Sequence, residues 1–115
     1  MSITVADGFL DQLRGYSGAV HVELRSAAPA ELADIALHEA RRALHEVPHP
    51  LEPEDPFVSY VSDIIPGPRG PRFWFDAADA EGFPGIPEAL VEAIRTGLER
   101  GGLTDGEISW PDRPE

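Results

Sequence analysis

His21 and Glu23 are the residue pair whose types and spacing best suit chemistry. Both lie in a stretch of alternating polar and apolar residues, so they fall on one face of a predicted strand, about 6.5–7 Å apart along it. A histidine on such a face can act as a general base. Glu23 or Asp76 would orient its ring, and Arg25 or Arg72 would hold an anionic substrate. His21 and Glu23 are therefore candidate catalytic residues.

Glu39 is a third candidate, on a predicted helix. It falls between Leu32 and Ile35, at the edge of an apolar stripe. A partly buried glutamate can act as an acid or a base. The alternative is an ordinary ion pair with Arg42, three residues further on.

Histidine spacing gives no support to a metal site. His38 and His45 share a helix face but lie about 10 Å apart along its axis, too far to bind one ion. His49 follows in a proline-rich loop, where a third ligand is not evident. We expect no bound metal.

Other catalytic signatures are missing. The chain has no cysteine and no Gly-x-Ser-x-Gly. The stretch 67–71 contains two glycines, but its prolines lack the amide donors that hold phosphate. We therefore expect no cofactor, and we expect that the protein is not an enzyme, although an enzyme using His21 as base remains the alternative.

The charge of the chain narrows the class of partner. Acidic residues outnumber arginines 21 to 9, there is no lysine, and the net charge is −12. Phosphate backbones and anionic membranes repel such a chain, so nucleic acid and membrane partners are not expected. A basic protein partner is expected, and bacterial immunity proteins and inhibitors share this composition. Many proteins, however, are acidic for solubility alone.

Four predicted strands and two predicted helices position these residues. From residue 18 onward the predicted order is β-α-β-β-α-β, typical of a ferredoxin-like α+β fold with an antiparallel four-stranded sheet on two helices. Its strands are Gly18–Arg25, Phe57–Ile65, Arg72–Asp76 and Glu107–Trp110, and its helices follow Pro29 and begin near Pro87. We expect an N-terminal extension with a short helix at 1–17, one domain at 18–111 and a tail at 112–115.

Each predicted helix has one apolar stripe. The first stripe comprises Leu32, Ile35, Ala36, Ala40, Ala43, Leu44 and Val47, and the second comprises Leu90, Val91, Ile94, Gly97 and Leu98. Gly97 lacks a side chain within its stripe, which predicts a close approach to the sheet.

Alternation assigns the remaining polar and aromatic residues to a second sheet face. If Phe73 and Phe75 face the helices, Trp74 faces away from them. The residues predicted on the second face are His21, Glu23, Arg25, Trp74 and Asp76, with Tyr60 as a further binding residue. Ile108 and Trp110 are predicted to point inward.

The strand Phe57–Ile65 is apolar on both faces, so either Val58, Tyr60 and Ile64 or Phe57, Val61 and Ile65 could face outward. A mixed face with an aromatic centre is typical of a protein interface or a ligand pocket. A solvent-facing sheet is the plain alternative, and pairing with a second copy of the chain is another.

No stretch suggests a secretory signal or a membrane span. We therefore expect a small, acidic, soluble, cytoplasmic bacterial protein. Its expected function is protein binding without catalysis, as an inhibitor-like protein or a complex subunit; the alternative is a small-molecule-binding protein or a small enzyme.

Overall fold

A computed structural model describes residues 3–14, 18–77 and 82–110 as one mixed five-stranded sheet and three helices. The α+β class is therefore confirmed. The tail expected at 112–115 lies outside the described residues. The strand order is β1-β5-β2-β4-β3, with the strands β1 (Ile3–Val5), β2 (Gly18–Arg25), β3 (Val58–Val61), β4 (Arg72–Ala77) and β5 (Gly106–Ser109). The helices are α1 (Phe9–Arg14), α2 (Ala30–Leu44) and α3 (Ile86–Arg100).

β2 is the central strand, as its clean alternation predicts. It pairs antiparallel with β4 along most of its length, and with β5 over its last three residues. Val20, Val22 and Leu24 are at most 1% exposed. The longest strand of the sheet therefore lies where both of its edges are hydrogen-bonded.

The N-terminal segment contains a strand that the sequence did not predict. Residues 3–5 pair in parallel with residues 106–108 of β5. The short helix predicted after Asp7 is present as α1, and its Phe9 and Leu13 are buried in the core. The described residues 3–14 thus contribute a sheet edge as well as a helix.

β3 is shorter than the predicted strand. The register between β3 and β4 shifts between Val58 and Val61, which leaves two residues opposite Asp76. Both predicted alternations are therefore wrong, because a bulge interrupts the period of two. Val58 and Val61 are buried, whereas Tyr60 is 52% exposed and Ile65 is 43% exposed.

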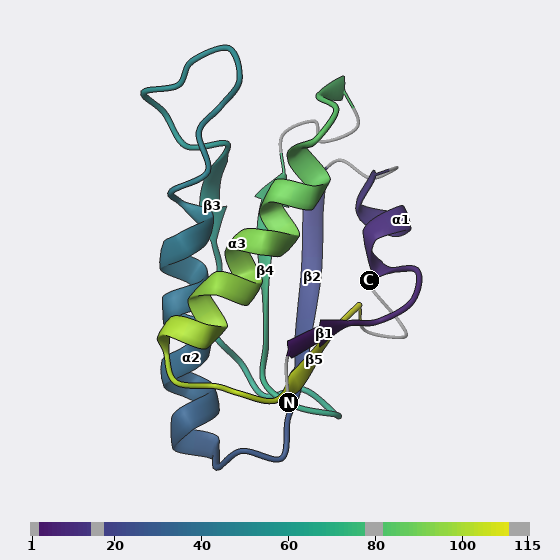
Figure 1. The fold of residues 1–115 in the computed structure, drawn as a ribbon, viewed down its shortest axis with the longest axis vertical. Helices are drawn as coiled ribbons and strands as arrows, with labels where there is room; N and C mark the ends of the chain where they lie inside the picture. Colours follow the sequence, from purple (N-terminus) through teal and green to yellow (C-terminus); the bar gives the residue numbers. More distant parts are fainter. Residues whose placement is uncertain (1–2, 15–17, 78–81, 111–115) are drawn as a thin grey trace.

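The two long helices cover the same sheet face (Figure 1). Gly97 of α3 is the point of close approach, but its neighbour is α2 and not the sheet. A Cβ at Gly97 would come within 2.4 Å of the Cα of Ala40. The prediction of a close approach is right and its predicted partner is wrong, because the stripe of α3 faces both the sheet and the small residues of α2.

The stripe of α2 is rotated relative to the prediction. Ile35 is 55% exposed, whereas Leu37 is completely buried. Ala36 and Ala40 lie against Gly101, which caps the C-terminus of α3, and against Gly97 of α3, so this contact decides which side of α2 faces inward. None of the described helices is long and apolar enough to cross a membrane.

Candidate binding site on the uncovered sheet face

The sheet face opposite α2 and α3 is covered by no helix among the described residues (Figure 1). We call it the open face. Phe73 and Phe75 are at most 1% exposed against the helices, so Trp74 between them projects onto the open face. His21 is the cross-strand partner of Trp74 and lies on the same face. This orientation agrees with the prediction from alternation.

Five aromatic side chains form a continuous row that starts on this face. The ring of Tyr60 lies 5.1 Å from that of Trp74, and the ring of Trp74 lies 6.4 Å from that of His21. His21 in turn lies 6.3 Å from Trp110, which lies 6.1 Å from Phe9. We call this set the aromatic row. It is exposed at the Tyr60 end and buried at the Phe9 end.

The bulge in β3 helps to place the exposed end of the row. The backbone N–H of Trp74 donates to the hydroxyl Oγ of Ser62 at 2.9 Å, and the backbone N–H of Ser62 donates to the carbonyl of Trp74 at 2.8 Å. Ser62 itself is buried. The side-chain hydroxyl thus satisfies a backbone donor that the irregular pairing leaves without its usual partner.

The pKa of the His21 ring is lowered in this position, which favours the neutral ring. Burial lowers its pKa first, because it disfavours the charged ring, and the nearby charge of Arg72 lowers the pKa further. Its neighbours are the rings of Trp74 and Trp110. Within the described part of the chain, no carboxylate forms a hydrogen bond or an ion pair with His21. The structure therefore does not bring the predicted histidine and carboxylate together.

Glu23 lies on the predicted face but is not accessible there. Its side chain is 0% exposed, and Arg69 Nε donates to its Oε1 at 2.8 Å. Arg69 belongs to the loop between β3 and β4, and Gly67 of that loop lies directly over Oε2. The expectation of an open binding residue is corrected, because this loop folds over Glu23 and an arginine neutralises it.

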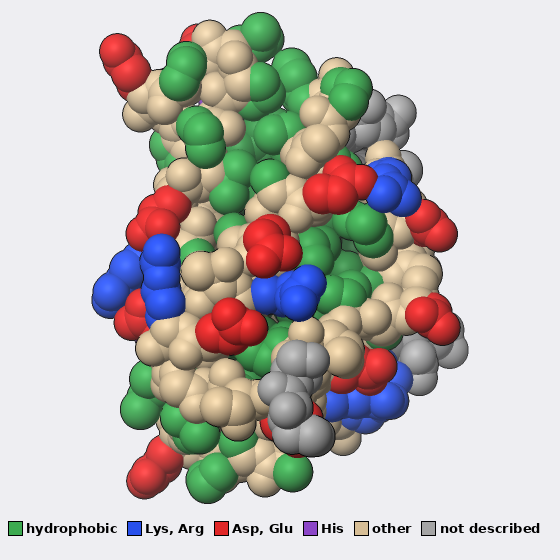
Figure 2. All heavy atoms as spheres, viewed as in Figure 1, with side chains coloured by type: hydrophobic (Ala, Val, Ile, Leu, Met, Phe, Trp, Pro, Cys, Tyr) green, Lys and Arg blue, Asp and Glu red, His purple; other side chains and the backbone are tan. Residues whose placement is uncertain are grey.

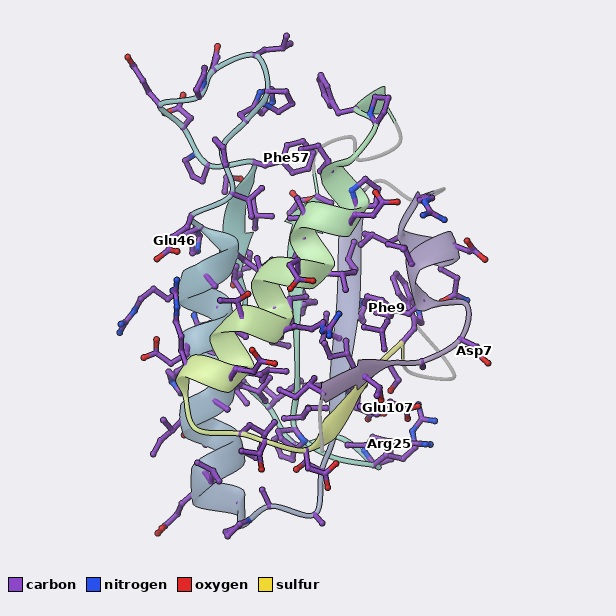
Figure 3. All side chains as sticks on the ribbon, viewed as in Figure 1. Asp7, Phe9, Arg25, Glu46, Phe57 and Glu107 are labelled. Atoms are coloured by element: carbon purple, nitrogen blue, oxygen red, sulfur yellow. The ribbon has the colours of Figure 1, made fainter. Side chains whose placement is uncertain are left out.

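Arg25 and Asp76 lie toward opposite ends of the open face. Arg25 pairs with Glu107 at 3.4 Å, and Figure 3 shows the two side chains together where β2 meets β5. Asp76 is exposed and forms no ion pair with a described residue. Of the six predicted binding residues, three are exposed. Asp76 and Tyr60 lie at one end of the open face, and Arg25 lies at the other.

Glu39 does not belong to this site. It lies on α2, in the layer that covers the other face, and pairs with Arg42 at 3.4 Å. The plain ion-pair alternative describes its contacts. Its side chain is 25% exposed, as expected for the edge of a stripe.

His38 of the helix and His49 of the proline-rich loop also lie apart from the open face. His38 Nδ1 lies 2.9 Å from the backbone carbonyl of Asp34, within α2. His49 packs against the rings of Phe57 and Phe83. Over the described ranges, no group of three or more His, Asp and Glu side chains could hold a metal ion.

The sequence did not place Trp110, Arg69 or Phe9 at the site. Trp110 was expected to point inward with Ile108. However, β5 ends at Ser109, and the Trp110 ring contacts His21. Pro111, directly after it, was a sequence signal that alternation need not extend this far. Arg69 lies in a loop and Phe9 is distant in sequence, so no local pattern links either one to His21.

The helix-covered face has a different character. Figure 2 shows several of its carboxylates beside arginines and others with no arginine next to them. The ion pairs include Arg14 with Glu88, Arg42 with Glu39, Arg95 with Glu92 and Arg100 with Glu46. No comparable aromatic row lies over these helices among the described residues. Comparison with protein-family models, curated proteins and solved structures finds no match to this chain.

Proposed function

We propose that this protein is a non-enzymatic binding module that engages a basic protein partner through the open face. The observation that carries the proposal is the exposed end of the aromatic row, Tyr60, Trp74 and His21, which lies on a sheet face that no described helix covers. Trp and Tyr are enriched among residues that dominate binding energy at protein interfaces. Tyr60 and Trp74 would form the centre of the contact.

Partial exposure supports an interface rather than a core. Tyr60 is 52% exposed and Trp74 is half-buried, so a partner can still remove aromatic surface from water. A whole aromatic side chain has about 150–250 Å² of surface, and the part of each ring that is still exposed is what a partner would bury. A fully buried row would have offered nothing to a partner.

The charge supports a basic partner. A net charge of −12 attracts positively charged proteins and accelerates their encounter. Asp76 on the open face is exposed and has no ion pair with a described residue, so its charge is available to such a partner.

The contacts of His21 give no support to the enzyme alternative. A general base needs a group that orients its ring; of the two predicted candidates, Glu23 is bound to Arg69, and neither Glu23 nor Asp76 has a hydrogen bond or ion pair with His21. Small-molecule binding at the open face stays a prediction with no observation that favours it.

We also infer that β5, β2, β4 and β3 with α2 and α3 form a ferredoxin-like unit, which β1 extends. Support comes from the strand order β5-β2-β4-β3, from the antiparallel pairing of each neighbouring pair, and from helices α2 and α3 as crossover connections. A bacterial cytoplasmic setting is proposed from composition alone.

Capture from the source lysate tests the function with a matched pair of variants. The bait proteins are the parent, Trp74→Ala and Ile35→Ala; the last removes an exposed apolar side chain from the helix layer. We expect the parent and Ile35→Ala to retain a basic protein at low salt and to lose it at high salt. We expect Trp74→Ala to retain little of this protein even at low salt. Equal retention by Trp74→Ala, with its fold verified by circular dichroism, would refute the proposal.

Sedimentation of the purified chain tests the alternative occupant. A monomer at micromolar concentration leaves the open face available to a different protein. A stable dimer that Trp74→Ala dissociates would replace the basic partner with a second copy of the chain.

A further inference from the structure

Tyr60, Trp74 and Asp76 form the most accessible corner of the open face. Asp76 follows Trp74 by two residues in β4, so both side chains project from the same side of the sheet. Tyr60 lies in the two-residue bulge opposite Asp76, and its ring is 5.1 Å from that of Trp74. We call these three residues the aromatic–acid corner.

No described arginine pairs with Asp76 in this corner. The arginines of the open face and its loop lie with acids at the other end: Arg25 pairs with Glu107, and Arg69 pairs with Glu23. Arg72 is the cross-strand partner of Glu23. The corner therefore combines two aromatic rings with a carboxylate that has no ion pair among the described residues.

The proline-rich loop 48–56 adds negative charge at the same end of the sheet. It leads into β3, whose Val58 pairs with Ala77, the neighbour of Asp76. Glu52, Glu54 and Asp55 of the loop are exposed and form no ion pair with a described residue. The field at this end attracts a cation toward the corner.

We propose that the aromatic–acid corner binds an arginine side chain of the partner protein. The guanidinium would stack on the rings of Trp74 and Tyr60 while it donates hydrogen bonds to the carboxylate of Asp76. This inference rests on the proposed function and names the partner residue that the open face recognises.

Arginine fits the corner better than lysine for a geometric reason. Its guanidinium is planar, so it can stack on an indole or phenol ring and still present donors at its edge to a carboxylate. A lysine ammonium is a compact, strongly hydrated charge that cannot stack in this way. An anion would be repelled by Asp76.

Short labelled peptides test the proposal by fluorescence anisotropy. The three peptides share one sequence except at two positions. Both positions carry arginine in the first peptide, lysine in the second and uncharged citrulline in the third. We expect the arginine peptide to bind about twofold to fivefold more tightly than the lysine peptide, as a stacked cation at an exposed site implies. The citrulline peptide should bind weakest.

Variants locate the effect. Trp74→Ala and Tyr60→Ala keep the net charge and should each abolish the preference for arginine over lysine. Asp76→Asn should weaken arginine binding more than Glu99→Gln, which removes the same charge from the exposed side of α3. Tyr60→Ala keeps the test valid if Trp74→Ala fails to fold.

The outcomes separate this inference from the proposed function. Equal binding of the arginine and lysine peptides, or an Asp76→Asn effect no larger than that of Glu99→Gln, overturns the arginine site. The proposed function would survive that result if Trp74→Ala still lost the captured partner. If Trp74→Ala kept both the preference for the arginine peptide and the captured partner, the arginine site and the proposed function would both be overturned.

Discussion

Gly97 lies so close to Ala40 that a Cβ on Gly97 would come within 2.4 Å of the Ala40 Cα and 2.6 Å of the Glu39 carbonyl oxygen. Both neighbours are backbone atoms, which cannot move aside as a side chain can. The separation of α2 and α3 is therefore set by the absence of a side chain at this position.

Gly97→Ala should destabilise the protein, and Gly97→Leu should do so more strongly. Overpacking typically costs about 1–3 kcal/mol, which outweighs the ~1 kcal/mol that alanine gains in helix propensity. Denaturant unfolding measures both, with Glu99→Leu as a control on the exposed side of the same helix. A midpoint for Gly97→Ala at or above that of the parent would contradict the close packing of the two helices.

Phe73→Ala and Phe75→Ala should be far more destabilising than Trp74→Ala. Both phenylalanines are at most 1% exposed, so each truncation should cost about 3–5 kcal/mol. Trp74 is half-buried on the open face, so its variant should remain folded with a smaller loss. Urea melts of the three variants compare them directly. If Trp74→Ala were the least stable, the aromatic row would be a structural element rather than a binding surface.

Arg69→Met should destabilise the fold because it leaves the buried carboxylate of Glu23 without its partner. Breaking a buried pair from one side costs about 3–5 kcal/mol, and Glu23 is completely buried. Adding Glu23→Gln should recover part of this loss, since the uncompensated charge is then removed. Arg42→Met is the control, because it breaks an exposed pair worth at most about 1 kcal/mol. Denaturant unfolding measures the stability of these variants. A midpoint of unfolding for Arg69→Met equal to that of Arg42→Met would show that the loop does not neutralise Glu23.

The His21 ring should titrate below about 6.5, the usual pKa of histidine. Burial and then Arg72 lower the pKa in the folded state, so the unfolded state binds a proton first as the pH falls. The stability that His21 contributes is thus complete above about pH 6.5 and declines below it, until the folded-state pKa is passed. Urea melts across this range should show a shallower pH dependence for His21→Gln than for the parent.

Arg72→Met should raise the His21 midpoint in an NMR titration, but not fully to the usual value, because burial is the larger cause. Arg25→Met is the control, since Arg25 is paired with Glu107. An unchanged midpoint in Arg72→Met would mean that burial alone lowers the pKa.

Local periodicity was enough to predict most elements and the orientation of the middle strands. The alternation around Val20 and Val22 and around Phe73 and Phe75 correctly separates buried from outward-facing residues, because a strand presents successive side chains to opposite faces. The same argument placed His21 and Trp74 on one sheet face, where they are cross-strand partners.

Contacts between distant segments decided the rest. β1 is three residues long and pairs with a strand about a hundred residues away, so no local pattern could reveal it. Which side of α2 is buried depends on the contact of Ala36 and Ala40 with the glycines of α3; hence Leu37 is buried and Ile35 is exposed.

For the candidate site, the sequence by itself determined that His21, Glu23, Trp74 and Asp76 share one sheet face, and the tertiary structure decided which of them a partner can reach. Glu23 is closed off by Arg69 from a loop 46 residues away, and Trp110 reaches His21 from beyond the end of β5. Strand alternation is a property of the local backbone, whereas accessibility depends on whatever else the chain folds over that backbone. That is why Tyr60, Trp74 and Asp76 remain available while Glu23 does not.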